Sequence, residues 1–370
     1  MVLRRRVPGP PSAIVLAAGE GTRMKSSRPK PLHVLCGRPM LMHVLDSLNS
    51  VDVGRTVVVV GHGAERVTKR VQEQARSELR IDFVEQLVQR GTGDAVSVGL
   101  TAFPDDDPDD ESTIIVLPGD TPLLQASTIA GLVDLHEETE AAATVLTARL
   151  DDPTGYGRVV RDKNGRVARI VEQRDASDEE RAIDEINTSI YCFRRNLLAP
   201  ALRRLSPENA QGEYYLTDVV AVLHDAGYTI SAHIADDANE ALGVNDRVQL
   251  AAAEAALRER TNTAWLRAGV TMLDPAQTFI DVTVRLAPDV TLFPGTILQG
   301  STIIGSGCEI GPDTRLVDCV VGESCVVENS VGRQAEVGAG SRVGPYAVLQ
   351  AGSSLAPGTV TGPFYTASAE

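Results

Sequence analysis

Residues 13–33 read AIVLAAGEGTRMKSSRPKPLH, and this stretch decides the fold of the first half of the chain. The apolar run Ala13–Leu16 is short, and glycines at positions 19 and 21 follow it, which is typical of a buried parallel strand that ends in a turn. Arg23 and Lys30 lie in the basic segment after these glycines. Backbone N–H groups of a glycine turn can approach a phosphate closely. The stretch therefore predicts either an anion-binding turn or an ordinary strand–helix turn with solvated basic residues.

The same alternation of strand and helix continues to about residue 230. Further buried strands are expected at Thr56–Val60 and Ser112–Leu117. Between residues 41 and 48, leucine and valine recur at i, i+3, i+4 and i+7, which predicts one face of a helix. This alternation favours an α/β domain with a mostly parallel sheet, in which ligands bind beyond the carboxyl ends of the strands.

From Ile280 onward the pattern changes to aliphatic residues about every six positions, usually followed by a small residue. The positions that mark successive turns are Ile304, Ile310, Val321, Val337, Val343 and Leu349. This period is typical of a parallel β-helix, in which each coil has three faces and the aliphatic side chains point into the column. A β-sandwich with glycine turns is the alternative. A β-helix needs capped ends, and we expect the tail GPFYTASAE or a partner to cover one of them.

The length of 370 residues predicts more than one domain. We expect a disordered basic arm over residues 1–12 and an α/β domain over residues 13–245. The alanine-rich segment VQLAAAEAALRER predicts a linker helix over residues 246–270. The β-helix is expected over residues 271–370.

Charge and composition exclude several classes of partner. The net charge of −15 argues against nucleic acid or an anionic membrane as the main partner. The apolar runs are far shorter than the ~20 residues of a membrane span, and no signal peptide is recognisable, so a cytoplasmic protein is expected. The five cysteines include no CxxC pair, which predicts free, buried thiols.

Two further motifs carry candidate chemistry. In QLVQRGTGDA (residues 86–95), the Gln86 amide could read the edge of a flat base, although the same residues could form an ordinary helix start at Thr92. Asp120 follows a strand in PGDTPLL, where a carboxylate is suited to Mg²⁺, although a simple Asp-Thr-Pro turn is the alternative.

Together these motifs resemble those of the nucleotidyltransferases that make nucleotide sugars. The chain is most similar to the bacterial family of bifunctional N-acetylglucosamine-1-phosphate uridyltransferase/glucosamine-1-phosphate acetyltransferases. The motifs that carry the resemblance are LAAGEGTRM, RPKPLH, GTGDA, GDTPLL, GYGRV, IVEQ, EINTSIY, NAQGEYYLTD and GVND.

The resemblance implies that UTP and N-acetylglucosamine 1-phosphate react to give UDP-N-acetylglucosamine and pyrophosphate. It assigns Arg23 and Lys30 to the phosphates as catalytic residues, and Asp120 and Asn245 to Mg²⁺. The other substrate-binding residues that it implies are Leu16, Ala17, Ala18, Gly19, Gln86, Gly91 and Thr92 for the uracil, and Gly157, Glu172 and Asn187 for the acetylated sugar. Gly119 is expected to bind substrate as well. Asn245 is expected to bind substrate as well as metal. Side-by-side packing of β-helices, as in this family, implies a homotrimer.

The sequence also departs from the family pattern. Asp94 stands where the family usually has histidine, and Pro118 replaces a tyrosine or small polar residue. A different sugar 1-phosphate or dTTP therefore stays open, as does a catalytically silent assembly subunit. In the β-helix, Gln350 replaces an arginine of the acetyl-transfer segment, and PFYTAS (residues 363–368) lacks the basic residue. The resemblance implies a left-handed parallel β-helix that is shortened here, and we expect no acetyltransferase activity. The divergent tail suggests a natural end.

Overall fold

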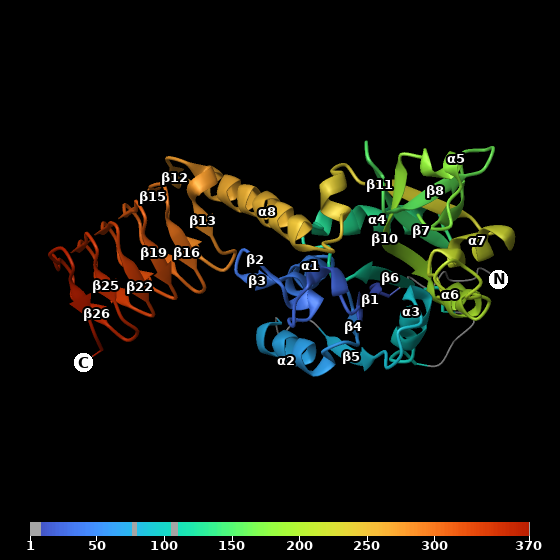
Figure 1. Cartoon of the computed structure of the whole chain (residues 1–370), viewed down its shortest axis with the longest axis horizontal. Helices are drawn as coiled ribbons and strands as arrows, with labels where there is room; N and C mark the ends of the chain where they lie inside the picture. The colour runs from blue at the N-terminus through green and yellow to red at the C-terminus, as the bar shows by residue number, and fades with distance from the viewer. Residues whose placement is uncertain (1–8, 76–79, 105–109, 370) are drawn as a thin grey trace, which may run out of the picture. The chain divides into compact units, whose positions relative to one another are not determined.

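The computed structural model describes residues 9–75, 80–104 and 110–369, so residues 1–8 of the expected arm lie outside the described residues. Two compact units are present (Figure 1). The first comprises residues 1–33 and 39–249, and the second comprises residues 34–38 and 250–370. Among the described residues, no helix combines the length and apolarity that a membrane crossing requires.

The first unit is built on one sheet. Its strands are β1 (Ser12–Ala17), β4 (Arg55–Val60), β5 (Ile81–Glu85), β6 (Thr113–Pro118), β7 (Ala143–Arg149), β8 (Gly157–Arg161), β9 (Val167–Val171), β10 (Glu185–Arg194) and β11 (Ile230–Ile234). Its helices are α1 (Met40–Asn49), α2 (Ala64–Gln74), α3 (Thr92–Leu100), α4 (Ala126–Glu138), α5 (Asp178–Arg181), α6 (Arg195–Leu202) and α7 (Asp218–Asp225). Short 3-10 turns are η1 (Thr22–Met24), η2 (Lys30–Leu32) and η3 (Ala238–Ala241). Helix α8 (Arg247–Arg267) follows, and β2 (Val34–Leu35) pairs with β3 (Arg38–Pro39).

The strand order is β11-β7-β10-β6-β1-β4-β5, with the hairpin β8–β9 attached through β10. Strands β6, β1, β4 and β5 are parallel, whereas β10 runs antiparallel to β6, β7 and β8. In the register, Leu16 lies beside both Val59 and Pro118. The carboxyl ends of β1, β4 and β6 therefore lie side by side. The predicted α/β fold with a mixed sheet is confirmed.

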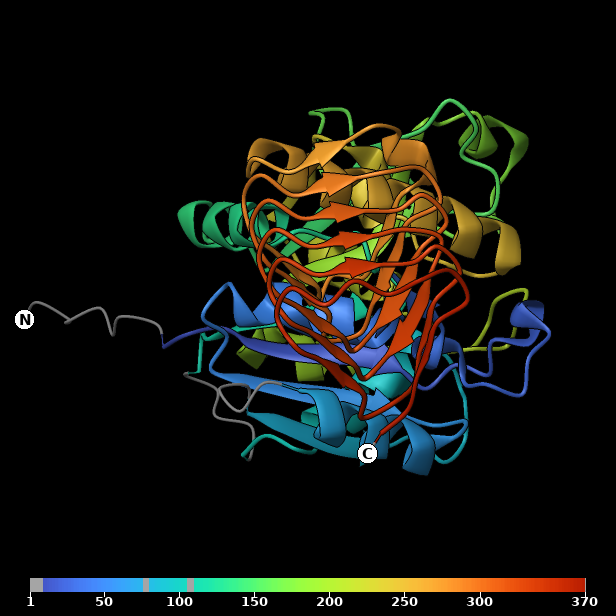
Figure 2. The same ribbon diagram turned by 90° about the vertical axis from the view of Figure 1, so that its left-hand side faces the viewer.

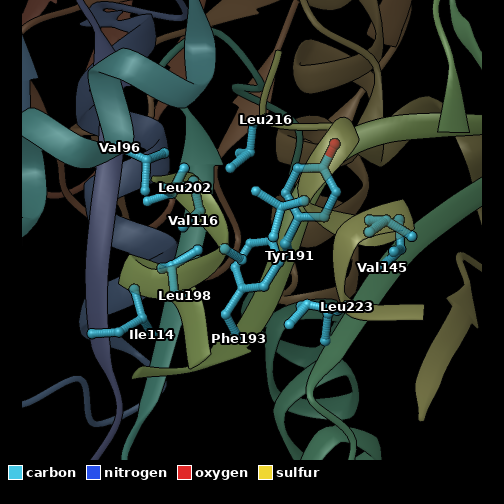
Figure 3. Close-up of a cluster of buried hydrophobic side chains, with 14 of the residues drawn as sticks. Val96, Ile114, Val116, Val145, Tyr191, Phe193, Leu198, Leu202, Leu216 and Leu223 are labelled. Carbon is cyan, nitrogen blue, oxygen red and sulfur yellow. The ribbon is translucent and has the colours of Figure 1, made fainter. Parts of the chain in front are cut away.

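Helices cover both faces of this sheet because side chains alternate along each strand. On one face, Ile14 packs with buried residues of α3, α6 and α7, and Figure 3 shows how Tyr191 and Phe193 of β10 enter this cluster. These two rings are stacked, with centroids 5.4 Å apart. On the other face, Ala13 and Val15 pack against α1, α2 and α4. The predicted helical face at residues 41–48 contributes to this second cluster.

The second unit contains three further parallel sheets. The first consists of β12 (Thr271–Met272), β15 (Thr291–Leu292), β18 (Glu309–Ile310), β21 (Val326–Val327) and β24 (Arg342–Val343). The second consists of β13 (Phe279–Ile280), β16 (Ile297–Gln299), β19 (Arg315–Val317), β22 (Val331–Arg333), β25 (Val348–Leu349) and β27 (Thr366–Ala367). The third consists of β14 (Arg285–Leu286), β17 (Ile303–Ile304), β20 (Val320–Val321), β23 (Glu336–Val337) and β26 (Ser354–Leu355). The turn η4 (Pro275–Gln277) lies before β13.

These sheets are the three faces of a parallel β-helix, whose stacked coils Figure 2 shows end-on. All six aliphatic residues predicted to mark the turns are buried in its core. The six-residue period is interrupted, because the step from Leu316 to Val321 has only five residues and the inward position of β22 is Gly332. A Cβ atom at Gly332 would lie 3.0 Å from the Leu316 side chain and 3.2 Å from the Cys319 sulfur. These two side chains fill the space that an aliphatic residue at 332 would occupy.

The cysteines behave as predicted. All five are free and buried. Cys308, Cys319 and Cys325 are part of the apolar core of the β-helix. Burial raises the pKa of the Cys308 thiol to about 11, so this group stays protonated and packs as an apolar side chain.

Candidate active site

A cavity of about 610 Å³ opens at the carboxyl ends of β1 and β6. All fifteen residues that the sequence singled out as site residues line it: Leu16, Ala17, Ala18, Gly19, Arg23, Lys30, Gln86, Gly91, Thr92, Gly119, Asp120, Gly157, Glu172, Asn187 and Asn245. They come from segments spread over 230 positions of the sequence, and the sheet order brings them together. The carboxyl ends of the strands are where the binding site of a parallel sheet is expected.

The basic segment after β1 is folded back on itself, with its glycine turn against Lys30. Gly21 has a φ of +65°, which favours glycine, and a Cβ atom there would lie 2.6 Å from the Cβ atom of Lys30. Turn η1 contains Arg23, and turn η2 begins with Lys30. The glycine-permitted bend at Gly21 therefore packs against Lys30, and both Arg23 and Lys30 line the cavity.

Arg23 and Lys30 converge on one acceptor, the side-chain oxygen of Asn245, and Lys30 also contacts Asp120. The Lys30 ammonium donates to Asn245 Oδ1 over 2.9 Å and forms an ion pair with the Asp120 carboxylate. Arg23 Nη2 donates to the same Asn245 Oδ1 over 3.0 Å. The side chain of Lys30 is only 14% exposed, so this charge network is screened weakly by solvent.

Asp120 and Asn245 fit the donor chemistry of Mg²⁺. Both present an oxygen atom within reach of a single cationic nitrogen, so a cation is already accommodated between them. No cluster of three or more His, Cys, Asp or Glu side chains within residues 9–75, 80–104 and 110–369 could hold a metal ion. A pair of oxygen ligands without such a cluster suits Mg²⁺, which usually keeps several waters and is completed by substrate phosphates.

Gln86, Gly91 and Thr92 line the cavity where β5 passes into α3. Gln86 is 5% exposed, and its backbone N–H donates to Val60 O, which ties the residue to the end of β4. Gly91 has a φ of +111°, and a Cβ atom there would lie 2.6 Å from Tyr214 O. Only glycine therefore fits this turn. Thr92 Oγ1 accepts a hydrogen bond of 3.0 Å from the Leu216 N–H, which holds the start of α3.

Gly157, Glu172 and Asn187 also line the cavity and lie close to one another. A Cβ atom at Gly157 would lie 3.6 Å from both Asn187 Cβ and Glu172 Oε2, so the small residue keeps this part of the cavity open. Burial raises the pKa of the Glu172 carboxyl, and the nearby Asp218, Asp175 and Glu213 raise it further. The 3.3 Å hydrogen bond from Thr217 Oγ1 to Glu172 Oε1 acts in the opposite direction.

The cavity also contains residues that the sequence did not single out. Gln89 lines it and donates to Ala18 O over 2.6 Å, which links the β5–α3 loop to the first turn. Tyr156 lines it, and burial raises the pKa of its hydroxyl, as does the charge of Asp120. Pro118 is a lining residue as well, which places this departure from the family pattern at the cavity itself. Tyr156 lies inside the quoted GYGRV motif, from which only the glycine at 157 was taken.

One more residue acts on the cavity without lining it. Arg158 is 1% exposed, and its guanidinium donates to Gln173 Oε1 over 2.8 Å and to Tyr156 O. Gln173 Oε1 also accepts from the Gly155 N–H over 3.2 Å. The buried arginine therefore links Gly155, through Gln173, to Tyr156, and both of these residues line the cavity. Its position in GYGRV was visible in the sequence, but nothing there indicated burial.

The fold and the cavity define a nucleotidyltransferase. The family model described as "Nucleotidyl transferase" matches residues 12–269. A bifunctional protein GlmU from Heliobacterium modesticaldum is 46% identical over 353 residues, which cover 95% of this chain and 75% of that protein. The bifunctional protein GlmU of Thermobifida fusca is 48% identical over 329 residues, covering 89% of this chain and 67% of that protein. The chain therefore belongs to the nucleotidyl transferase family and, within it, to the GlmU family.

Proposed function

We propose that the chain joins UTP and N-acetylglucosamine 1-phosphate to give UDP-N-acetylglucosamine and pyrophosphate. The observation that carries this proposal is the single cavity lined by all fifteen residues that the family resemblance implies. The similarity to bifunctional GlmU proteins over 95% of the chain supports it. The retained Gly157, Glu172 and Asn187 favour an acetylated amino sugar over other sugar 1-phosphates.

The chemistry requires no protein nucleophile. A phosphate oxygen of the sugar 1-phosphate attacks the α-phosphorus of UTP in line, and a new P–O bond forms. The bond from the α-phosphorus to the oxygen that bridges to the β-phosphate breaks, and pyrophosphate leaves with the electron pair. Protein groups therefore contribute by holding the reactants in line and by offsetting negative charge.

Arg23 and Lys30 are the groups that offset this charge. Without substrate they are held by Asn245 and Asp120, so the cations are already placed in the cavity. Placing charge before the reaction begins avoids the cost of reorganising it during the reaction. Bound Mg²⁺ would be held by Asp120 and Asn245 and would neutralise charge on the phosphate oxygens.

Two parts of the cavity differ in what they can recognise. Gln86 and the turn at Gly91-Thr92 offer amide and backbone groups suited to a base edge. Glu172 and Asn187, about the small Gly157, offer acceptors and donors suited to sugar hydroxyl and acetamido groups. This division supports a binding position beside β5 for the nucleotide and one beside β8 for the sugar.

The β-helix is proposed to assemble the chain into a homotrimer. On the second sheet of the β-helix, the outward positions in register include Phe279, Ile297, Arg315, Val331 and Val348, and the side chains of Phe279, Val331 and Val348 are 40–44% exposed. Four of these five side chains are apolar, which suits contact with another copy. Light scattering should give about three times the monomer mass, and Val331→Glu combined with Val348→Glu should reduce it. A monomeric wild-type chain would contradict the proposal.

Acetyl transfer is proposed to be absent from these 370 residues. Gln350 stands where the family pattern of the acetyl-transfer segment has arginine, and residues 363–368 carry no basic side chain. Both changes remove positive charge from the segments in question. Acetylation of glucosamine 1-phosphate by the purified chain with acetyl-CoA would contradict this part of the proposal.

Pyrophosphate release tests the main proposal. The purified chain should be assayed with Mg²⁺ against UTP, dTTP, CTP, ATP and GTP, each with several sugar 1-phosphates. UTP with N-acetylglucosamine 1-phosphate should give the highest kcat/KM. A higher value with another pair would change the assigned substrates, and no turnover with any pair would favour a silent assembly subunit.

A further inference from the structure

The side-chain amide of Gln86 is held in one orientation by two acceptors. Its Nε2 atom donates to Asp94 Oδ2 over 2.7 Å and to Gly91 O over 3.3 Å. An amide nitrogen has two N–H groups, so these two hydrogen bonds use both of them. Asp94 lies in the first turn of α3 and is not among the residues that line the cavity.

The chemistry of the two partners determines which way the amide faces. A carbonyl oxygen can only accept, and an ionised carboxylate can only accept. A rotated amide would place Oε1 against Gly91 O and Asp94 Oδ2, which would leave three acceptors without a proton between them. The carboxylate at 94 therefore fixes the nitrogen of Gln86 toward the protein.

The oxygen of the same amide is left for a ligand. Gln86 lines the cavity, and among the described residues no hydrogen-bond donor reaches its Oε1 atom. Oε1 is not fully buried, so it is accessible from the cavity. Gln86 thus offers the cavity an acceptor and no donor.

We propose that Asp94 is a positioning residue that makes Gln86 select a base with an N–H at ring position 3. This inference rests on the proposed function, in which Gln86 contacts the base. Uracil and thymine carry a donor at N3, whereas N3 of cytosine is an acceptor and would oppose Oε1. Histidine, usual in this family at position 94, can donate or accept, so it would not fix the amide in this way.

The Asp94→Asn variant tests the proposal because asparagine can donate as well as accept. Rotation of the Gln86 amide then becomes possible, opposed only by Gly91 O. The ratio of kcat/KM for UTP to that for CTP, both with N-acetylglucosamine 1-phosphate, should fall at least about tenfold. A structural role alone would lower both values equally and leave the ratio unchanged.

Glu65→Gln is the matched control. Glu65 is an exposed acidic residue in the first turn of α2, so its replacement also removes a first-turn carboxylate but leaves Gln86 untouched. It should leave the ratio of UTP to CTP unchanged. A similar fall in both variants would overturn the proposal, because the effect would then come from helix-end charge.

Binding to the wild-type chain gives a second test that needs no variant. Calorimetry should show that N3-methyluridine triphosphate, in which a methyl group replaces the N3 proton and both ring carbonyls are kept, binds at least about tenfold more weakly than UTP. Equal affinities would overturn the proposal about Asp94 while leaving uridyl transfer in place. A wild-type chain that turns over no UTP in the panel assay, by contrast, would reject the proposed function itself.

Discussion

Lys30 and Asp120, 90 positions apart in the sequence, form an ion pair at the carboxyl ends of β1 and β6. The same ammonium donates to Asn245 Oδ1. Asp120→Asn keeps the shape of the side chain but removes its charge, which weakens both the hold on Lys30 and the proposed hold on Mg²⁺. We expect kcat to fall about 100-fold or more in the pyrophosphate-release assay.

The control for this variant is Asp134→Asn, because Asp134 is an exposed carboxylate on α4. Its kcat should match that of the wild-type chain. An Asp120→Asn variant that keeps kcat within about threefold would exclude Asp120 from the charge network of the reaction.

We expect Glu172 to lower the stability of the fold at pH 7 although it favours substrate binding. Burial, followed by the charges of neighbouring carboxylates, raises its pKa above the ordinary value of 4.5. The folded state therefore binds a proton more tightly than the unfolded state does. Its contribution to stability is complete below pH 4.5 and is lost as pH rises through the raised pKa. At pH 7 Glu172 destabilises the fold.

Glu172→Gln should therefore raise the Tm at pH 7, by a few degrees at most, since ~1 kcal/mol shifts the Tm of a unit of 150–250 residues by about 2–4 °C. The gain should shrink as pH falls through the raised pKa of Glu172 and should be absent below pH 4.5, where the carboxyl is protonated in both states. The KM for N-acetylglucosamine 1-phosphate should rise. Glu179→Gln, at an exposed site in α5, serves as the control with unchanged Tm. A lower Tm for Glu172→Gln at pH 7 would show that the charged form is stabilised instead.

Arg158 should affect the sugar phosphate and not the nucleotide. Its guanidinium holds Gln173 and the backbone carbonyl of Tyr156, and Tyr156 lines the cavity next to Gly157 of the proposed sugar site. Hydrogen bonds of a charged group contribute about 1.5–3 kcal/mol, and lysine cannot reproduce the planar fork of arginine. Arg158→Lys should raise the KM for the sugar phosphate about tenfold and leave the KM for UTP unchanged, as measured by steady-state kinetics.

Arg169→Lys provides the comparison, because Arg169 lies on β9 and forms a more exposed ion pair with Glu180. Exposed pairs contribute about 0–1 kcal/mol, so its kinetics should match the wild type. Equal increases in both KM values for Arg158→Lys would indicate a general loosening of the domain.

The β-helix should tolerate no side chain at Gly338. A Cβ atom there would lie 2.4 Å from Pro357 N and 2.7 Å from Ala356 C, which belong to the next coil. Backbone atoms in a ladder cannot move independently, so Gly338→Ala should cost at least about 1–3 kcal/mol of unfolding free energy in urea. Gly362→Ala, with no heavy atom within 4 Å of the added Cβ, should cost far less. Equal midpoints for the two variants would mean that the coils are less tightly stacked than described.

Three parallel strands at the centre of the sheet, β1, β4 and β6, could be predicted from the sequence, because short aliphatic runs mark buried parallel strands. Thr56–Val60, for example, matches β4 except for one residue at its start. The site could be predicted only through motifs, since Lys30, Asp120 and Asn245 meet through the strand order rather than through spacing. No local pattern specifies that order.

The remaining features depend on packing that a single sequence does not reveal. Arg158 resembles any surface arginine until β8 and β9 enclose it. The five-residue step after Leu316 does not by itself indicate that Cys319 fills the space beside Gly332, because that contact depends on how the coils stack. Asp94 was predicted to affect base choice, but its contact with Gln86 depends on how β5 turns into α3.

Because each coil of the β-helix hydrogen-bonds only to its neighbours, energetic coupling should decay along its axis. Val321, Val337 and Leu355 occupy equivalent positions on successive strands β20, β23 and β26. Alanine substitutions at Val321 and Val337 should be non-additive, whereas those at Val321 and Leu355 should add within about 0.5 kcal/mol. The effect of a mutation on the β-helix would then extend to the adjoining coil and be largely absent from the coils beyond it.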